Sequence, residues 1–391
     1  MQQPHPPLQA ETLSGTAVQP PSARSAGWRK KLLHLHLFAA LGLGLFVSVI
    51  TVTGSISQYR KDIERWLIAA PAGVRGDTDP SATAAALKSR YPGRQLTALV
   101  VSRGDGEADT WTLRNRDPEA VVQTFSVFTD PGTGAWLGDS EASLTARFLA
   151  STYHFHHMMW IRTWGRWLVG VAGFATLILV LGGVVLAWPH LRAWVRSGRL
   201  LRFADVRDWH LRAGTLLAPI LLASALTGIL CAYIAWWRPP LLAASRQPVP
   251  ASVTALPGEA KPDWGSVIAI SALAAPNTTL HGVQAPRHGD TPRVWRVVRR
   301  WDGELSPRDG VLISVDADSG AVVGIEDPRH LDPARLLLFQ QISFHIGWFA
   351  GLDVRWLWLL VGLSPPAFLV SGLILWRRRR ANKATAKRTK C

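Results

Sequence analysis

The chain has 391 residues, of which 48% are hydrophobic and 18% are charged, with 19 tryptophans and a formal net charge of +16. A positive mean hydropathy of +0.11 indicates apolar membrane-spanning segments rather than two or three soluble domains. Only Cys231 and Cys391 are present, which excludes a disulfide framework. Without CxxC or CxxCH motifs, zinc ribbons, thioredoxin-like chemistry and covalently attached c-type haem are excluded as well.

Four segments contain no Asp, Glu, Lys or Arg, and each is long enough to cross a hydrocarbon core of roughly 30 Å. In chain order they are residues 32–56, 167–188, 213–237 and 356–376, and Trp or Tyr residues stand at their ends, as is typical of membrane interfaces. No small-residue cleavage site follows the first span, so we expect it to remain attached. The sequence therefore predicts a multi-pass protein in a lipid bilayer.

The distribution of basic residues predicts how the spans are oriented. Residues 1–33, 189–209 and 377–391 carry 17 Lys and Arg against three acidic residues, which accounts for +14 of the net charge. By the positive-inside rule these segments, and hence both termini, lie in the cytoplasm. The basic excess then has a topological origin, and no nucleic-acid partner is expected. The long connections lie in the periplasm if the cell has two membranes, which places the protein in the inner membrane.

The two halves of the chain carry the same residues at the same spacing. The interval from His36 to Gly54 is repeated from His210 to Gly228. His156 is followed by Arg166 and Gly183 at the same intervals at which His345 is followed by Arg355 and Gly372. Matching Asp-x-x-x-Gly turns occupy residues 130–134 and 316–320. The sequence therefore predicts a tandem repeat of span, domain and span.

The predicted fold class is a membrane all-α four-helix bundle with two periplasmic α+β domains. We expect a helix over residues 82–90, strands over 96–101 and 110–113, and strands over 294–298 and 311–315. The segments in chain order are a disordered cytoplasmic N-terminus (1–27), the first transmembrane helix (28–59), the first periplasmic domain (60–155), the second transmembrane helix with a periplasmic lead-in (156–190), a cytoplasmic loop (191–208), the third transmembrane helix (209–237), the second periplasmic domain (238–344), the fourth transmembrane helix with its lead-in (345–376) and a basic cytoplasmic tail (377–391).

The repeat places four histidines in two pairs. His36 and His210 begin outward-running spans and share the cytoplasmic side, whereas His156 and His345 precede inward-running spans and share the external side. Ionisable residues at span ends indicate a functional role. Two imidazoles on neighbouring helices at each face are typical of two six-coordinate b-type haems. A bare copper or zinc site has less support, because no thiolate or carboxylate with ligand spacing is nearby, and a merely polar interfacial role is the other alternative.

Small residues and prolines fit the haem hypothesis. Ala40 and Gly214 lie one turn after the first two histidines and leave space for a porphyrin plane. Pro219 and the pair Pro365 and Pro366 are expected to kink the third and fourth spans and widen the cavity.

Further residues are assigned around the haems. Arg166 and Arg355 are predicted to pair with haem propionates. His34, His154 and His157 are alternative ligands; for His154 and His157 the reason is that the register within residues 153–159 can shift by a few positions. No GxGxxG, Walker or GxSxG motif is present, so flavin, nicotinamide, ATP and serine-nucleophile chemistry have no motif behind them. The electrons must therefore come from a separate donor.

Taken together, these residues resemble the PepSY-associated transmembrane family. The motifs are Thr53-Gly54 after His36, the turn at 130–134, Gly165-Arg166-Trp167 after His156 and the sequence Ser-Gly-Leu-Ile-Leu-Trp at 371–376. The resemblance covers residues 28–380 and gives the two external domains a PepSY-like fold. Within the family the chain is most similar to the four-span inner-membrane ferric-siderophore reductases of the FoxB type. This resemblance implies two haems and reduction of siderophore-bound iron in the periplasm, although Ala40 stands where the family often has glycine and the second external domain is less regular.

The expected function is di-haem electron transfer across the membrane. A cytoplasmic or quinol donor reduces the His36/His210 haem, and the His156/His345 haem then reduces a ferric siderophore, so that iron is released for uptake. Siderophores bind the hard ion Fe(III) far better than Fe(II), and no catalytic side chain beyond the haem ligands is required. The candidate contacts for an anionic chelate are Arg162, Arg293, Arg296, Arg299 and Arg300. The alternatives are a PepSY-type regulatory or binding membrane protein and a haem- or metal-handling factor without reductase activity; a transporter lacks a membrane-embedded carboxylate or lysine.

Overall fold

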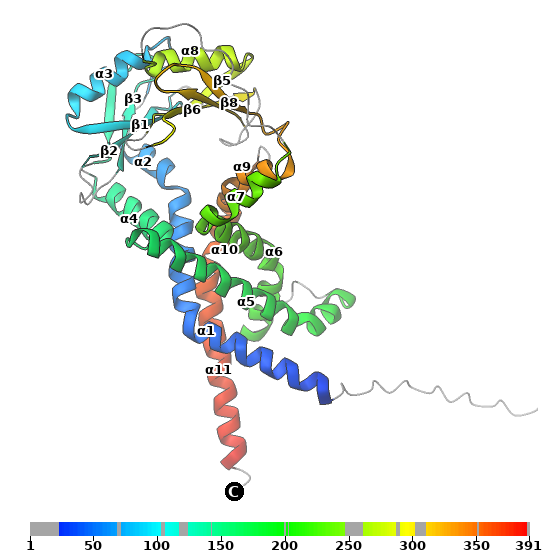
Figure 1. The fold of residues 1–391 in the computed structure, drawn as a ribbon. Helices are drawn as coiled ribbons and strands as arrows, with labels where there is room; N and C mark the ends of the chain where they lie inside the picture. Colours follow the sequence, from blue (N-terminus) through cyan, green and yellow to red (C-terminus); the bar gives the residue numbers. More distant parts are fainter. Residues whose placement is uncertain are drawn as a thin grey trace, which may run out of the picture.

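The computed structural model describes residues 23–68, 72–102, 106–116, 124–141, 143–198, 201, 203–246, 261–286, 290–301, 310–349 and 352–388. Figure 1 shows two parts along one axis, a bundle of long helices and a sheet with two helices on its outer face. The start of α1 (Ala23–Gln58) and the end of α11 (Ser364–Arg388) lie away from the sheet. We call this the termini end of the bundle, and the opposite end the sheet end. The segment predicted to be disordered, residues 1–27, falls mostly outside the described residues.

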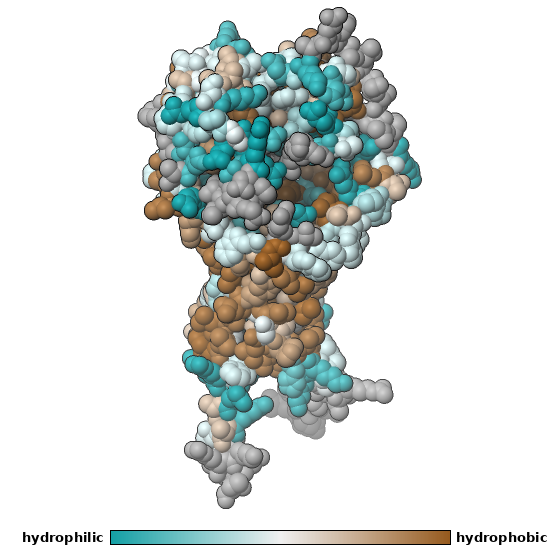
Figure 2. Space-filling model, turned by 60° about the vertical axis from the view of Figure 1, so that its left-hand side comes forward, coloured by the Kyte–Doolittle hydropathy of each residue, from teal (hydrophilic) through white to brown (hydrophobic). Residues whose placement is uncertain are grey.

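The long helices of the described chain include four that are long and apolar enough to cross a membrane, Gly27–Gln58, Trp164–Arg196, Val206–Ala232 and Arg355–Thr385. They belong to α1, to α5 (Arg162–Arg196), to α6 (Val206–Ala232) and to α10 (Arg355–Gly362) together with α11. On the face of the bundle that Figure 2 shows, a band of apolar side chains lies between two more polar ends. The four predicted spans are thereby confirmed, and the chain is a multi-pass membrane protein.

The prolines act differently in the two halves of the bundle. α6 runs through Pro219 without interruption, whereas α10 and α11 are separated at Leu363, directly before Pro365 and Pro366 in the first turn of α11. The first N–H groups of a helix have no intrahelical partner, so proline is tolerated there. Kinks are expected in both spans; the fourth span is interrupted next to its prolines, whereas α6 stays continuous and a kink at Pro219 stays a prediction.

The strands of the described chain form one antiparallel eight-stranded sheet with the order β4-β3-β2-β1-β5-β6-β7-β8. The first four strands are β1 (Arg94–Val100), β2 (Asp109–Asn115), β3 (Thr124–Thr129) and β4 (Trp136–Asp139), and the other four are β5 (Thr278–Gln284), β6 (Val294–Trp301), β7 (Val311–Asp316) and β8 (Val322–Glu326). The expected strands are present, and the expected helix at 82–90 is α3 (Pro80–Arg90). Its counterpart in the second half is α8 (Trp264–Ala274), which makes the chain an α+β membrane protein.

The two loop regions are not separate domains, which corrects the sequence expectation. β1 pairs with β5 through Ala98 opposite Gln284, Leu99 opposite Val283 and Val100 opposite Gly282. Two separate four-stranded sheets would each leave one of these strands as an unpaired edge, and the pairing satisfies both edges at once. The result is a single sheet domain built from both connections.

The core of the sheet domain also joins both connections. The Trp264 ring of α8 lies between Trp111 of β2 and Trp295 of β6, with edge-to-face contacts at centroid distances of 5.0 Å on each side. The N-termini of α3 and α8 are linked by the Ser81 hydroxyl, which donates to Asp263 at 2.6 Å. Burial of three large rings in one cluster makes the two halves one hydrophobic core.

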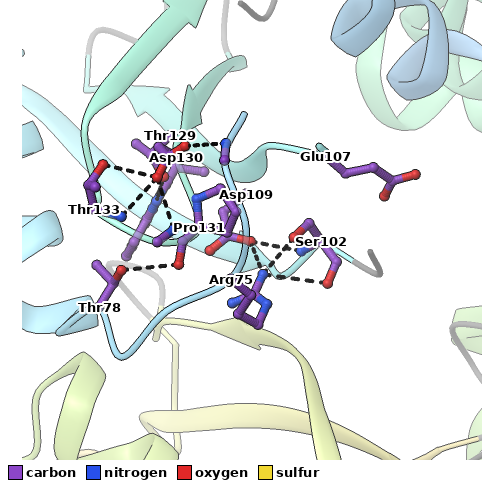
Figure 3. Close-up of polar contacts among 12 residues, drawn as sticks. Arg75, Thr78, Ser102, Glu107, Asp109, Thr129, Asp130, Pro131 and Thr133 are labelled. Atoms are coloured by element: carbon purple, nitrogen blue, oxygen red, sulfur yellow. Dashed lines mark hydrogen bonds and ion pairs between the residues drawn. The ribbon is translucent and has the colours of Figure 1, made fainter. Parts of the chain in front are cut away.

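Polar contacts hold the segment between α2 (Arg60–Ile68) and α3 against the sheet, as Figure 3 shows. The Asp130 carboxylate accepts hydrogen bonds from the Gly73 backbone N–H at 2.6 Å and from the Thr133 backbone N–H at 2.8 Å. These hydrogen bonds, that from Gly73 first, lower the pKa of the Asp130 carboxyl from its ordinary value. Arg75 forms an ion pair with Asp109 at 2.6 Å. The Asp-x-x-x-Gly turn predicted from the sequence thus also anchors the chain that enters the domain.

Short helices connect the sheet domain to the bundle. They are α2 (Arg60–Ile68), α4 (Leu144–Met158), α7 (Ile234–Ala244) and α9 (Pro333–Ile346), with a small hairpin of β9 (Trp348–Phe349) and β10 (Leu352–Asp353) before α10. In α2, Glu64 is only 2% exposed and accepts a hydrogen bond from the Ser126 hydroxyl of β3 at 2.8 Å. Arg60 lies 3.5 Å from the same carboxylate and compensates its charge. This contact fixes the end of the first span to the sheet.

We predict that replacing Trp264 by alanine destabilises both halves of the sheet domain together. A buried tryptophan changed to alanine costs about 3–5 kcal/mol, and this ring contacts both β2 and β6. Thermal unfolding of the detergent-purified protein, followed by near-ultraviolet circular dichroism, should show one transition at a lower temperature. Trp136→Ala, at a ring that is 41% exposed, is the control and should shift it much less. Two separate transitions would contradict the single core.

Candidate functional site

The bundle contains a partly open cavity of about 790 Å³ towards the termini end. Its walls come from α1, α5, α6 and α11, and both His36 of α1 and His210 of α6 line it. Ala40 and Gly214, the small residues singled out in the sequence, line it too. A volume of this size lies within the range of small-molecule and cofactor sites, about 300–1,000 Å³. The structure thus brings the first predicted histidine pair to one ligand-sized space.

Each imidazole of this pair packs on a glycine of a neighbouring span. A Cβ atom added to Gly183 of α5 would lie 3.5 Å from the His36 ring, and one added to Gly372 of α11 would lie 3.6 Å from the His210 ring. These are the glycines that follow the second and fourth repeated histidines at equal intervals in the sequence. Their spacing therefore reflects a ring-to-glycine contact between helices.

His156 and His345 form the second pair, at the sheet end. Their ring centroids are 6.1 Å apart and the ring planes are inclined by 17°. Both residues lie near the ends of the short helices α4 and α9, which precede the membrane-spanning helices α5 and α10. Each ring again packs on a glycine: an added Cβ would lie 2.6 Å from the His156 ring at Gly54 and 3.0 Å from the His345 ring at Gly228. The two rings therefore depend on glycine at these positions of α1 and α6.

The alternative ligands do not join either pair. The His157 ring stacks on Tyr153 at 5.7 Å, and the His154 ring meets the same tyrosine edge-on at 5.7 Å. His34 is exposed on α1, two residues before His36. Of the histidines of α4, His156 is the one that lies nearest to Gly54 of α1.

Hydrogen bonds determine which ring nitrogen is free in the second pair. His156 Nδ1 lies 2.8 Å from the Ile50 carbonyl oxygen, and His345 Nδ1 lies 3.2 Å from the Ser224 carbonyl oxygen. A carbonyl oxygen only accepts, so each Nδ1 carries the hydrogen and donates it. The neutral rings then keep a lone pair on Nε2, which is the atom available to a metal.

His210 also carries its hydrogen on Nδ1, but the acceptor is a hydroxyl group instead of a backbone carbonyl. Its Nδ1 lies 2.8 Å from Ser371 Oγ, and that hydroxyl donates its own hydrogen to the Phe368 carbonyl at 3.1 Å. Ser371 therefore accepts from His210 Nδ1, and Nε2 is again the free nitrogen. Gly182 stands at the equivalent place beside His36, where an added Cβ would lie 3.6 Å from Nδ1. Because glycine offers no hydroxyl, the two rings of this pair are held differently.

The separation of the two pairs follows from helix geometry. His36 and Gly54, the glycine under His156, both lie on the continuous helix α1. His210 and Gly228, the glycine under His345, lie on α6 at the same interval. Each interval spans about five helical turns, or about 27 Å along the bundle. The pairs therefore lie near its two ends.

Arg166 and Arg355 occupy matching positions in the sequence but have different surroundings. Arg355 forms ion pairs with Asp62 at 2.6 Å and Asp353 at 2.8 Å, and its guanidinium lies 4.4 Å from the Trp348 ring centroid. It connects α10 to the α1–α2 junction and already has two carboxylate partners. The Nε atom of Arg166 is buried and has no hydrogen-bond partner in the part of the chain that the structure describes. That Arg166 and Arg355 pair with haem propionates stays a prediction. Arg355 already pairs with two carboxylates, whereas the contacts described here give Arg166 none.

The arginines predicted to contact a chelate are not one exposed surface, which corrects the sequence expectation. Arg299 is 8% exposed and donates to the Thr278 carbonyl at 2.6 Å, so it links β5 and β6. Arg300 is 6% exposed. Arg293 forms an ion pair with Asp318 at 3.1 Å, while Arg296 is exposed on β6. Arg299 and Arg300 are adjacent on β6 and therefore point to opposite faces of the sheet, yet both are buried. Arg162 is described only as the first residue of α5.

No group of three or more His, Cys, Asp or Glu side chains is arranged to hold a metal ion within the described residues. Paired histidines alone supply two of the four ligands that a structural zinc site requires. They do match a metal whose remaining ligands come from a macrocycle, as in haem with two axial imidazoles. The residues present therefore fit a haem better than a bare ion.

The fold and these contacts define an α+β multi-pass membrane protein with a histidine pair near each end of its bundle. The chain belongs to the PepSY-associated TM region family, which matches it over residues 33–379. The match reaches from the first span into the fourth and includes all four paired histidines. No curated protein sequence matches the chain.

We predict that Gly54→Ala lowers the free energy of unfolding of the protein, although alanine is a better helix former than glycine. The added Cβ would lie 2.6 Å from the His156 ring and force it to move, which costs about 1–3 kcal/mol. Gly42→Ala on the same helix is the matched control, because nothing lies within 4 Å of its added Cβ. In thermal unfolding of the purified protein the control should be unchanged or gain up to about 1 kcal/mol. Equal effects of both changes would argue against the ring contact.

Proposed function

We propose that the two histidine pairs hold two b-type haems and that the protein carries electrons across the inner membrane to a ferric siderophore in the periplasm. The observation that carries this proposal is the set of four imidazoles packed pairwise on glycines, with Nδ1 committed as donor in three of them. Such hydrogen bonds are typical of histidines that bind a metal through Nε2.

The dimensions of both sites support haem as the ligand. The cavity beside His36 and His210 is of cofactor size and is walled by apolar side chains and small residues. At the second site the ring centroids of His156 and His345 lie 6.1 Å apart, and these two rings would hold the iron of a second haem.

Each protein group has a defined task in this proposal. When bound, haem supplies reversible one-electron exchange. The four imidazoles would hold the iron, and the glycines beneath them keep the rings in place. Near the sheet end, His156 and His345 would bring the electron to the face of the bundle next to the sheet domain.

The direction of transfer follows from the charges at the two ends. The segments at the termini end carry the basic excess, which favours a cytoplasmic location for both termini and a periplasmic one for the sheet domain. A cytoplasmic or quinol donor would then act at the His36 and His210 end. The substrate is Fe(III) in an oxygen-donor chelate, and one electron converts it to Fe(II), which such ligands hold less tightly.

Matching contacts in the two halves support the tandem repeat. His36 on Gly183 corresponds to His210 on Gly372, and His156 on Gly54 corresponds to His345 on Gly228. Assignment to the reductases of the FoxB type is the finer part of the proposal and rests on sequence resemblance. The burial of Arg299 and Arg300 leaves the chelate surface unassigned, which favours the alternative of a PepSY-type binding or haem-handling protein without reductase activity.

We predict that the purified protein contains two b-type haems per chain and that His36→Ala and His345→Ala each retain one. Removing one axial ligand leaves the distant pair intact, because the pairs are about 27 Å apart along the helices. The measurement is a reduced-minus-oxidised visible spectrum with a pyridine haemochrome assay. His34→Ala and His154→Ala are matched controls and should retain both haems. A protein that stays colourless after haem-replete expression would rule out the proposal.

A second prediction separates the reductase from a haem-handling protein. The protein is reduced, freed of excess reductant and mixed anaerobically with a ferric siderophore, while haem reoxidation and Fe(II) capture by a chromogenic chelator are followed together. We expect wild type and His36→Ala to reoxidise rapidly, and His345→Ala, which keeps only the pair at the termini end, to reoxidise far more slowly. Haem that stays reduced in all three proteins would exclude siderophore reduction while leaving haem binding intact.

A further inference from the structure

The cavity beside His36 and His210 changes character towards the termini end. Five cationic residues line it there: Arg29 and Lys30 of α1, Arg207 of α6, and Arg378 and Arg379 of α11. The described lining contains no Asp or Glu. The cations come from three of the four spans and line one cavity, so their charges add at a single place.

These charges remain uncompensated in the contacts that the structure gives them. Arg29 donates to the Leu186 carbonyl oxygen at 3.0 Å, and Arg207 lies 2.9 Å from His190 Nε2. Neither partner carries a negative charge. Guanidinium groups are suited to carboxylates because their fork of N–H donors matches two oxygens.

The positive-inside rule alone does not explain why these particular cations line the cavity. Lys31, Arg377 and Arg380 carry the same charge at the same end of the bundle, yet they lie outside the described lining of the cavity. On α11 the lining residues include Gly372, Trp376 and Arg379, which share one helical face at spacings of four and three. Arg379 therefore lies on the face that also carries the glycine beneath His210.

The distance between the imidazoles and the cations follows from the helices. Arg29 precedes His36 by two helical turns on α1, and Arg379 follows Gly372 by two turns on α11. Two turns correspond to about 10 Å. The cavity thus has an apolar level with two imidazoles and cations further towards the termini end, from Arg207 within one turn of His210 to Arg29 and Arg379 at two turns. It suits a flat apolar ligand with carboxylates along one edge.

We propose that Arg29, Lys30, Arg207, Arg378 and Arg379 bind the two carboxylates of the tetrapyrrole held between His36 and His210, so that these carboxylates face the termini end. The inference rests on the proposed function. It replaces the sequence assignment of the propionates for this site, because Arg166 and Arg355 belong to the sheet end of the bundle.

The test compares two double variants of one helix, Arg378→Gln/Arg379→Gln in the lining and Arg377→Gln/Arg380→Gln outside it. Both remove two charges from the same end of α11. Each is made in the His345→Ala background and produced under haem limitation, and binding of iron protoporphyrin IX and of its dimethyl ester is titrated by absorbance. The ester keeps the macrocycle and lacks free carboxylates.

The His345→Ala protein with an otherwise unaltered cavity should bind iron protoporphyrin IX about tenfold or more tightly than its dimethyl ester, as expected for charge-assisted hydrogen bonds. The lining variant should lose this preference, and the control variant should keep it. Equal loss in both variants would assign the effect to phospholipid headgroups or general charge and overturn the proposal, as would a wild type without preference. Failure of every protein to bind either compound would instead overturn the proposed function.

A redox titration of the otherwise unaltered protein gives a readout that does not depend on reconstitution. Removing two cations near one haem favours its oxidised form, so Arg378→Gln/Arg379→Gln should lower one midpoint potential and leave the other unchanged. Arg377→Gln/Arg380→Gln should move neither by a comparable amount. Unchanged potentials in the lining variant would contradict the assignment.

Discussion

An imidazole inside a lipid-embedded bundle needs a hydrogen-bond partner for its N–H, because no water is present there to provide one. Three of the four paired histidines meet this requirement with acceptors from neighbouring spans, namely the Ile50 and Ser224 carbonyls and the Ser371 hydroxyl. The rings reach these acceptors because glycine leaves room on the facing helix. At the sheet end the same contacts attach α4 to α1 and α9 to α6. The site and the attachment of the connecting helices are therefore one set of interactions.

The sheet domain extends this coupling from one half of the chain to the other. The β1–β5 pairing and the Trp111–Trp264–Trp295 cluster join two connections that are separated in sequence by the second and third spans. Glu64 of α2, buried against β3, then links the sheet to the first span. The two histidine-bearing halves are thus held together both inside the bundle and beyond it, with no disulfide among the described residues.

The four spans could be predicted from the sequence, because the hydropathy of a span is a property of one segment. The four histidines could be singled out in the same way, because their spacing to Gly54, Gly183, Gly228 and Gly372 can be read from short stretches of sequence. Contacts between segments that are far apart in the sequence could not be predicted from such local patterns. The β1–β5 pairing depends on the partner edge, and the ion pair of Arg355 depends on Asp62, which is 293 residues away. The end of α4 was also missed, because Met159 and Trp160 adopt positive φ angles of 48° and 58° without a glycine to announce the break. Gly347 marks the corresponding end of α9, with φ 71°.

The continuity of α1 has a consequence for the relation between the protein and its lipid. His36 and Gly54 are joined by hydrogen-bonded helix, so the interval between the two histidine pairs is set by backbone geometry and not by bilayer thickness. A thinner or thicker membrane is accommodated by tilting the whole bundle or deforming the lipid, at a cost of fractions of a kcal/mol per ångström. Lipid composition can therefore change the depth at which each pair sits below its interface, while the distance over which the pairs communicate stays constant.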